Sequence, residues 1–230
     1  MGMATYDLTN AAVLVLGGSG ALGSRIARQL AERGASLTLA GRSQERLASV
    51  AATIDGSTMA IADLASTDDA TSVVDAAIEA HGRIDGIVNA AGVVAFGPLA
   101  GTSPSVIDEV IAVDLAGPLH VYRQAVPRMD GGFIVNITGI VATMPTAGMA
   151  TYSAAKAGLA AATVALAREL RREGITVIDA RPPHTETGLV DRSLAGDAPN
   201  LPTGLDPDRV AARIVVGIES GERILEPDSF

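Results

Sequence analysis

Two side chains that could carry acid–base chemistry, Tyr152 and Lys156, stand four positions apart in a stretch with helical spacing. Side chains four positions apart share one face of a helix, so the phenol and the ammonium would be neighbours. A phenol with an unperturbed pKa of about 10 is ionised in only about one molecule in a thousand at pH 7. A nearby ammonium favours the phenolate and lowers that pKa. The pair predicts a proton donor and acceptor suited to neutral pH, although such spacing alone is more common on solvated helix faces.

A glycine-rich turn lies near the N-terminus. The apolar run Ala12–Leu16 predicts a buried strand, and apolar residues with helical spacing follow from Leu22 onwards. Between them, Gly18-x-Gly20-x-x-Gly23 matches the dinucleotide fingerprint in its required context of strand, turn and helix. Free N–H groups and the positive end of the helix dipole would bind a pyrophosphate there. The expected contacts come from Gly17, Ser19, Gly20, Leu22 and Gly23.

Short apolar runs alternate with helical patterns along almost the whole chain. This alternation predicts βαβ units and therefore a parallel sheet with helices on both faces. We expect an α/β fold of the Rossmann type, a doubly wound parallel sheet in a single domain over residues 1–230. The expected strands are 12–16, 36–40, 58–62, 86–89, 133–137, 176–180 and a short 223–225. Helices are expected after residue 22 and at 45–50, 68–81, 105–129 (interrupted at Gly117-Pro118), 149–172 and 206–220.

In an open parallel sheet, ligands bind beyond the carboxyl ends of the strands. The residue after the second strand distinguishes the two nicotinamide cofactors, because an acid binds the ribose 2′-hydroxyl and an arginine accommodates a 2′-phosphate. This chain has Gly41 and then Arg42, which favours NADP(H) over NAD(H) unless Arg42 is only a solvated loop cation. Further candidate contacts at strand ends are Asp63, Leu64, Asn89, Ala90, Gly92, Pro182, Thr185 and Thr187.

Together these motifs resemble the short-chain dehydrogenase/reductase family over nearly the whole chain. Tyr152-Ser153-Ala154-Ala155-Lys156 fits its Tyr-x-x-x-Lys motif, and Asn89-Ala90-Ala91-Gly92 fits a signature that supports the sheet beneath the cofactor. Asp63-Leu64 resembles the pair that contacts adenine, and residues 182–187 resemble the segment that meets the nicotinamide carboxamide. The resemblance implies hydride transfer between NAD(P) and a carbonyl or alcohol carbon. Tyr152 would then pass the proton, and Lys156 would hold the nicotinamide ribose and tune the tyrosine.

Several positions depart from the family pattern, and two of them bear on catalysis. Gly139 stands where the family has its catalytic serine, thirteen residues before the tyrosine. Thr138 is a candidate to polarise the substrate carbonyl, but on an extended strand its hydroxyl would point the other way, so Thr143, Thr146 and an ordered water are alternatives. Asp114 replaces the usual catalytic asparagine, which removes an amide donor and adds an anion near Lys156. A catalytic aspartate and a merely solvated or capping one are both open.

These departures leave a second class of function open, namely a regulatory protein that binds the cofactor but has lost efficient catalysis. A methyltransferase on a similar sheet is disfavoured, since it has no use for the Tyr152 and Asn89 motifs. An α/β-hydrolase is disfavoured because residues 17–21 fail Gly-x-Ser-x-Gly at the last position, Ala21.

Composition limits the partners. The formal net charge of −9 argues against a nucleic-acid surface, and the absence of cysteine excludes disulfides, thiolate zinc sites and a cysteine nucleophile. The three histidines are too scattered for a metal site, so no metal is expected. Without an apolar run long enough for a membrane, or a signal-peptide pattern, we expect a soluble cytoplasmic protein.

The substrate is expected to be a small, mainly apolar carbonyl or alcohol compound. We expect a homodimer or homotetramer that packs through the helices at 105–129 and 149–172. Arg192, in the long irregular loop 188–204, is the one basic residue that could meet a substrate anion. The apolar lining would come from Phe96, Met144, Met149, Leu189 and Val190.

Overall fold

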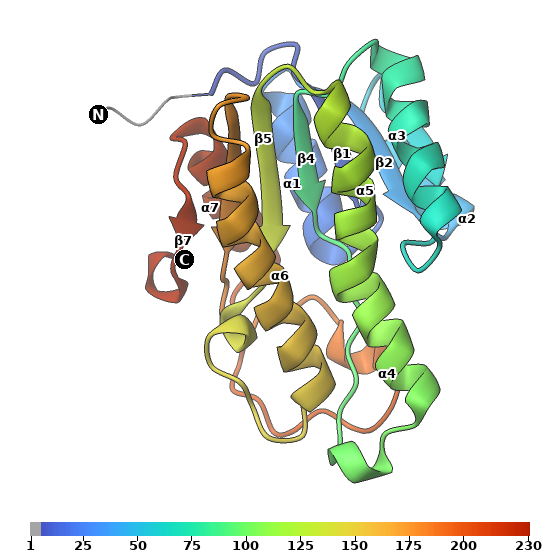
Figure 1. Ribbon diagram of the computed structural model, residues 1–230, viewed down its shortest axis with the longest axis vertical. Coiled ribbons are helices and arrows are strands. Elements are labelled where there is room, and N and C mark those ends of the chain that lie inside the picture. Colours follow the sequence, from blue (N-terminus) through green and yellow to red (C-terminus); the bar gives the residue numbers. More distant parts are fainter. Residues whose placement is uncertain (1–5) are drawn as a thin grey trace.

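The computed structural model describes residues 6–230, which form a seven-stranded sheet in the order β3-β2-β1-β4-β5-β6-β7 (Figure 1). Every neighbouring pair of strands is parallel. The expected α/β fold with a doubly wound parallel sheet is confirmed. The expected lack of a signal peptide concerns an N-terminus whose residues 1–5 lie outside the described part of the chain.

The elements alternate as expected, including the short last strand. The strands are β1 (Ala12–Leu16), β2 (Ser36–Gly41), β3 (Thr58–Ile61), β4 (Gly86–Asn89), β5 (Gly132–Ile137), β6 (Ile175–Ala180) and β7 (Ile224–Leu225). The helices are α1 (Ala21–Glu32), α2 (Gln44–Ala51), α3 (Thr67–His81), α4 (Pro104–Ile111), α5 (Gly117–Ala125), α6 (Ala150–Glu169) and α7 (Pro207–Glu219).

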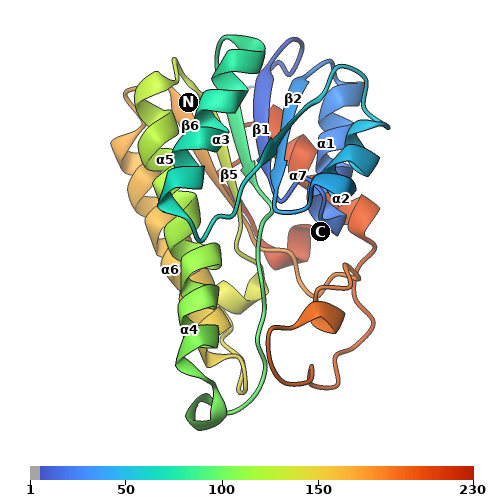
Figure 2. The same ribbon diagram turned by 90° about the vertical axis from the view of Figure 1, so that its right-hand side faces the viewer.

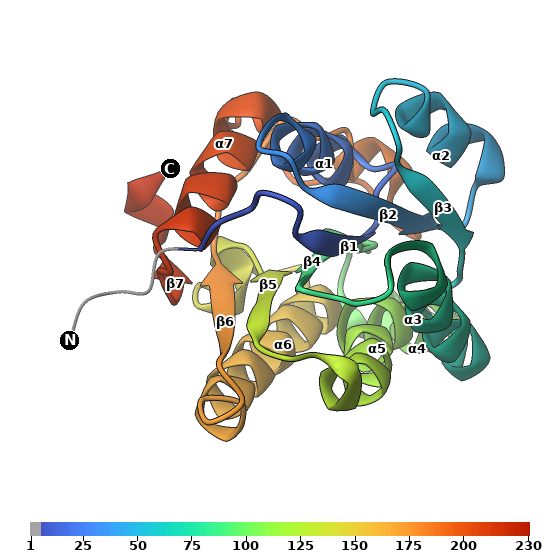
Figure 3. The ribbon, with the colours of Figure 1, turned by 90° about the horizontal axis from the view of Figure 1, so that it is seen from above.

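The sheet separates two hydrophobic cores. Successive residues of a strand face opposite sides, so Val13 and Val15 of β1 pack into one core, whereas Leu14 and Leu16 pack into the other. Helices α1, α2 and α7 cover the first face, and α3, α5 and α6 cover the second (Figure 3). Burial on both faces explains why β1 has no polar alternation, as is typical of parallel strands.

The long helix expected at 105–129 is interrupted one turn earlier than Gly117-Pro118. A π-helical turn, Ala112–Ala116, separates α4 from α5, and the Gly117 N–H donates to the carbonyl of Ala112, five residues back. Pro118 has no N–H for the carbonyl of Asp114, so the regular α-helical pattern cannot continue through this point. The turn widens the helix at Asp114, and such turns are frequent at functional sites.

Two segments extend beyond the carboxyl ends of the strands (Figure 2). One is α4 with the chain that leads into it after β4, and the other is the irregular segment between β6 and α7. Every strand points to this edge, so residues that follow different strands converge there. Within residues 6–230, no helix is long and apolar enough to cross a membrane.

Candidate active site

A cavity of about 550 Å³ opens at the carboxyl edge of the sheet, between these two segments. It collects residues that follow six of the seven strands, which explains why sites distant in the sequence come together. Of the residues expected to act, the cavity wall contains Gly17, Ser19, Gly20, Leu22, Arg42, Asp63, Leu64, Ala90, Gly92, Thr138, Tyr152, Lys156, Pro182, Thr185 and Thr187. Gly23, Asn89 and Asp114 lie behind that wall.

The turn between β1 and α1 fits a pyrophosphate. Gly17 has a φ of +72°, and a Cβ there would lie 2.7 Å from the backbone nitrogen of Ala91, so this position needs glycine. Helix α1 begins without a side-chain cap and without an acidic residue in its first turn. Its first N–H groups are therefore left for an external acceptor, and the helix dipole favours an anion there.

Two expected cofactor contacts, Gly23 and Asn89, act from behind the wall instead. A Cβ on Gly23 would lie 2.2 Å from the Gly17 carbonyl oxygen, so glycine lets α1 pack closely on the turn. Asn89 is buried and its Nδ2 donates to Asn136 Oδ1 at 3.2 Å, an acceptor shared with the Tyr122 hydroxyl at 2.5 Å. Both residues shape the site from behind the cavity wall, and their direct contact with a cofactor stays a prediction.

The end of the cavity near β2 carries two arginines. Arg42 and Arg46 both line it, together with Ser19 and Asp63. Arg42 lies 3.6 Å from Glu109 Oε1, but half of its side chain is exposed, so this ion pair is weak. Sequence reasoning missed Arg46, although its spacing of four residues from Arg42, across the start of α2, was a usable signal.

Tyr152 and Lys156 share one face of α6, as expected. The Lys156 Nζ lies 5.7 Å from the centre of the Tyr152 ring and donates to the Ile137 carbonyl at 3.2 Å. Asp114 faces the same ammonium, with Oδ2 at 3.6 Å, which is an ion pair without a hydrogen bond. Its Oδ1 accepts from the Val93 N–H at 2.8 Å. Asp114 is fully buried, so the solvated alternative considered for it is wrong.

The electrostatics differ from the expectation. Burial raises the pKa of Tyr152 above its ordinary value, and the Asp114 carboxylate raises it further. The pKa of Tyr152 therefore lies above its ordinary value, opposite to the expected lowering, and burial is the larger of the two causes. Burial also raises the pKa of Asp114 to about 6, although the Lys156 charge and the Val93 N–H favour its ionised form.

The model of the short chain dehydrogenase family matches residues 11–197. This chain is a short-chain dehydrogenase/reductase. It is an oxidoreductase that acts between CH–OH and C=O groups with a nicotinamide dinucleotide.

Relatives of this dehydrogenase span similar lengths. An uncharacterized oxidoreductase of Staphylococcus saprophyticus is 29% identical and covers 95% of each chain. A 3-oxoacyl acyl-carrier-protein reductase of Rickettsia bellii is 32% identical over 81% of this chain and 77% of its own. The crystal structure of a Burkholderia cenocepacia short chain dehydrogenase in complex with NADP is 30% identical, with a TM-score of 0.87, and covers 97% of this chain and 98% of its own.

The hydroxyl of Thr138 is not available to a substrate of this dehydrogenase. It donates to Asp179 Oδ1 of β6 at 2.5 Å and is fully buried. Thr138 therefore borders the cavity, but its hydroxyl is held by β6. The candidate catalytic role of Thr138 is therefore corrected to a structural one. Of the two threonines given as alternatives, Thr146 lines the cavity, whereas Thr143 does not.

Gly139, at the position of the family serine, has a backbone that disfavours any side chain. Its φ of +74° with a ψ of 165° is a conformation that essentially only glycine adopts. A Cβ there would meet only the Pro182 carbonyl oxygen, at 3.7 Å, so the obstacle is the backbone and not space.

Replacing Gly139 by serine is expected to lower the free energy of unfolding by about 1–3 kcal/mol, because the backbone becomes strained. Gly139→Ala is the matched control, since it carries the same strain without the hydroxyl. Denaturant unfolding of the three proteins should show equal losses for the two variants. A serine variant as stable as the parent would contradict the strained backbone.

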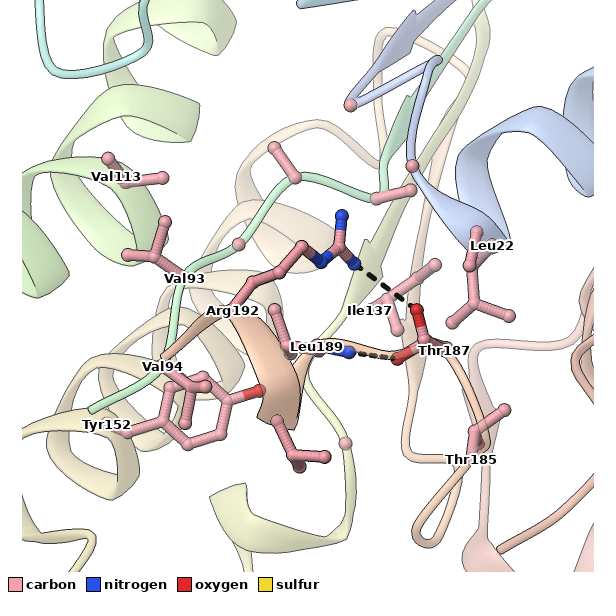
Figure 4. Close-up of a pocket in the computed structure, with 18 of the residues that line it drawn as sticks. Leu22, Val93, Val94, Val113, Ile137, Tyr152, Thr185, Thr187, Leu189 and Arg192 are labelled. Carbon is pink, nitrogen blue, oxygen red and sulfur yellow. Dashed lines mark hydrogen bonds between the residues drawn. The ribbon is translucent and has the colours of Figure 1, made fainter. Parts of the chain in front are cut away.

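The segment after β6 supplies the wall near Tyr152 (Figure 4). The Thr187 Oγ1 accepts from the Leu189 N–H at 3.3 Å, and the Thr185 Oγ1 donates to the Pro183 carbonyl at 2.9 Å. Both hydroxyls are thus held at the edge where the nicotinamide segment was expected.

Of the expected apolar lining residues, Phe96, Met149, Leu189 and Val190 reach the cavity. Met144 does not, because its exposed side chain lies outside the cavity wall, which corrects that assignment.

Proposed function

We propose that this chain transfers a hydride between NADP(H), preferred over NAD(H), and the carbonyl or alcohol carbon of a small, mainly apolar compound. The observation that carries the proposal is the common cavity that Tyr152 and Lys156 share with the glycine turn. An acid–base pair beside a dinucleotide site is the arrangement that reversible carbonyl reduction needs. Apolar side chains around Tyr152, among them Val94 and Leu189, favour an uncharged reacting group (Figure 4).

Each part of the cofactor has a proposed binding group. When bound, the nicotinamide supplies or accepts the hydride. Arg42 and Arg46 are two cations placed to receive a 2′-phosphate, which is the reason for the NADP(H) preference. We assign the pyrophosphate to Gly17, Ser19, Gly20 and Leu22, the adenine to Asp63 and Leu64, the ribose and carboxamide end to Lys156, Pro182, Thr185 and Thr187, and backbone contacts to Ala90 and Gly92.

The proton is proposed to pass through Tyr152. In the reduction direction, its hydroxyl donates a proton to the carbonyl oxygen as the carbonyl carbon receives the hydride. Thr146 is proposed to hold the carbonyl oxygen, since this residue lines the cavity and Gly139 has no hydroxyl. In the structure the Thr146 hydroxyl donates to the Met144 carbonyl at 3.4 Å, a bond that it would exchange for the substrate. Asp114 is proposed to act through Lys156, because it touches the ammonium and lies behind the wall.

The test is a titration with NADPH and NADH, followed by a panel of ketones and aldehydes. We expect NADPH to bind more tightly than NADH. Arg42→Gln should weaken NADPH binding by roughly tenfold, because a charge-assisted bond to phosphate is lost, and should leave NADH binding unchanged.

Two outcomes would contradict this proposal. Equal affinity for the two cofactors would remove the preference. Tight NADPH binding without reduction of any compound would indicate the cofactor-binding regulatory protein considered above.

We further propose that copies of the chain associate as homodimers or homotetramers through α4, α5 and α6, where Val164 leaves apolar surface exposed.

A further inference from the structure

Arg192 brings a positive charge into the cavity from the loop after β6. It belongs to the short turn Val190–Arg192 and lines the cavity wall. Its Nε donates to the Gly188 carbonyl at 3.0 Å, and its Nη2 donates to the Thr187 carbonyl at 3.2 Å. These two bonds hold the guanidinium of this exposed residue against the segment 187–188, at the mouth of the cavity (Figure 4).

The charge of this guanidinium is not compensated. Asp191 and Glu186 also line the cavity, but among the described residues no carboxylate forms an ion pair with Arg192. Its two hydrogen bonds go to neutral carbonyls, and Nη1 donates to none of the described residues. A guanidinium offers five N–H donors in a fork that matches phosphate oxygens, so several donors remain for an anion.

The loop that carries Arg192 is held in place at both ends. At its base, the Glu186 N–H donates to the Leu205 carbonyl at 3.0 Å, and the Leu205 N–H donates to the His184 carbonyl at 2.8 Å. Further along, the Leu194 N–H donates to the Val94 carbonyl at 2.8 Å. The position of Arg192 over the cavity is therefore set by backbone hydrogen bonds.

The direction of the Arg192 side chain indicates where in the cavity an anion would bind. In Figure 4 the guanidinium extends away from the Tyr152 hydroxyl and toward the side of the cavity where Leu22 lies, at the start of α1. The first turn of α1 carries no acidic residue and presents its N–H groups from that side. An anion between them would be held from two sides, by helix N–H groups and by the guanidinium.

We propose that Arg192 binds the diphosphate of the dinucleotide and closes it against the glycine turn. This inference rests on the proposed binding of NADP(H) and adds a residue from the opposite wall of the cavity. The alternative ligand is a carboxylate of the substrate. The guanidinium points away from the Tyr152 hydroxyl, where the substrate would react, and this direction disfavours that alternative (Figure 4).

The experiment measures binding by calorimetry, without turnover, with three ligands and three variants. NADP⁺ carries both the diphosphate and the 2′-phosphate, NAD⁺ carries only the diphosphate, and adenosine 2′-monophosphate carries only the 2′-phosphate. Arg192→Gln should weaken NADP⁺ and NAD⁺ by about tenfold and leave adenosine 2′-monophosphate unchanged. Arg42→Gln should leave the binding of NAD⁺ unchanged and weaken the binding of adenosine 2′-monophosphate. Arg172→Gln, an exposed arginine at the opposite edge of the sheet, is the control and should change none.

Three results would overturn the inference or separate it from the proposed function. If the parent protein binds no dinucleotide, the proposed function fails as well. If the parent binds NADP⁺ and Arg192→Gln binds it equally well, only the role of Arg192 fails. If Arg192→Gln keeps the NADP⁺ affinity but raises the KM of carboxylate-bearing ketones alone, Arg192 is a substrate receptor and the diphosphate assignment is wrong.

Discussion

Replacing Tyr152 by phenylalanine is expected to lower kcat for carbonyl reduction by roughly 10²–10⁴-fold, which is the usual contribution of a positioned general acid. The phenyl ring keeps the packing of α6 and the contact with the Lys156 ammonium, since that contact uses the ring face. Only the hydroxyl, and with it the proton, is lost. Steady-state kinetics with a ketone substrate and NADPH would measure the effect, and fluorescence titration should give an unchanged Kd for NADPH.

The chain provides a matched control in Tyr122. Its hydroxyl donates to Asn136 Oδ1 at 2.5 Å, and the side chain is buried in the core under α3, α5 and α6. Tyr122→Phe removes a buried hydrogen bond, so it should lower the free energy of unfolding by about 1 kcal/mol and leave kcat nearly unchanged. An active Tyr152→Phe protein, or equal losses of kcat in the two variants, would show that Tyr152 is not the proton donor.

Replacing Asp114 by asparagine is expected to increase stability above neutral pH. Burial raises the pKa of Asp114 from 3.8 to about 6, so the folded protein binds this proton more tightly than the unfolded chain does. The carboxyl group therefore contributes stability below pH 4 that is lost as the pH rises through 6. An amide remains neutral and its oxygen can still accept from the Val93 N–H. At pH 8 the variant should be more stable by about 2–3 kcal/mol, and this difference should shrink toward pH 4.

The same substitution should also change the pH profile. The Asp114 carboxylate raises the pKa of Tyr152, so its removal should lower that pKa. Alcohol oxidation requires the deprotonated tyrosine, and its kcat/KM should therefore rise at a lower pH in Asp114→Asn.

Asp191→Asn is the control, because this exposed carboxylate lines the cavity without an ion pair to Lys156. Thermal unfolding between pH 4 and 8 would measure stability. A less stable Asp114→Asn protein at pH 8 would mean that the ion pair with Lys156 outweighs the burial of the carboxylate.

The sequence by itself determined the sheet, the glycine turn and the Tyr152–Lys156 pair. These features are local: an apolar run predicts a buried strand, and a spacing of four residues predicts a shared helix face. Arg42 was predicted in the same way, from its place at the end of a strand. Arg46 was not predicted, because it lies on the following helix and not at the strand end. The start of α2 brings both cations to the cavity.

Tertiary structure alone decided what the side chains meet. Thr138 bonds to Asp179 on a neighbouring strand, and Asp114 faces Lys156 through a π-helical turn, so their roles depend on partners more than forty positions away. The predicted shift in the pKa of Tyr152 had the wrong direction, because burial and Asp114 act through space and the spacing of residues in the sequence reports neither. The direction of Arg192 across the cavity likewise follows from how its loop is held, which no local pattern encodes.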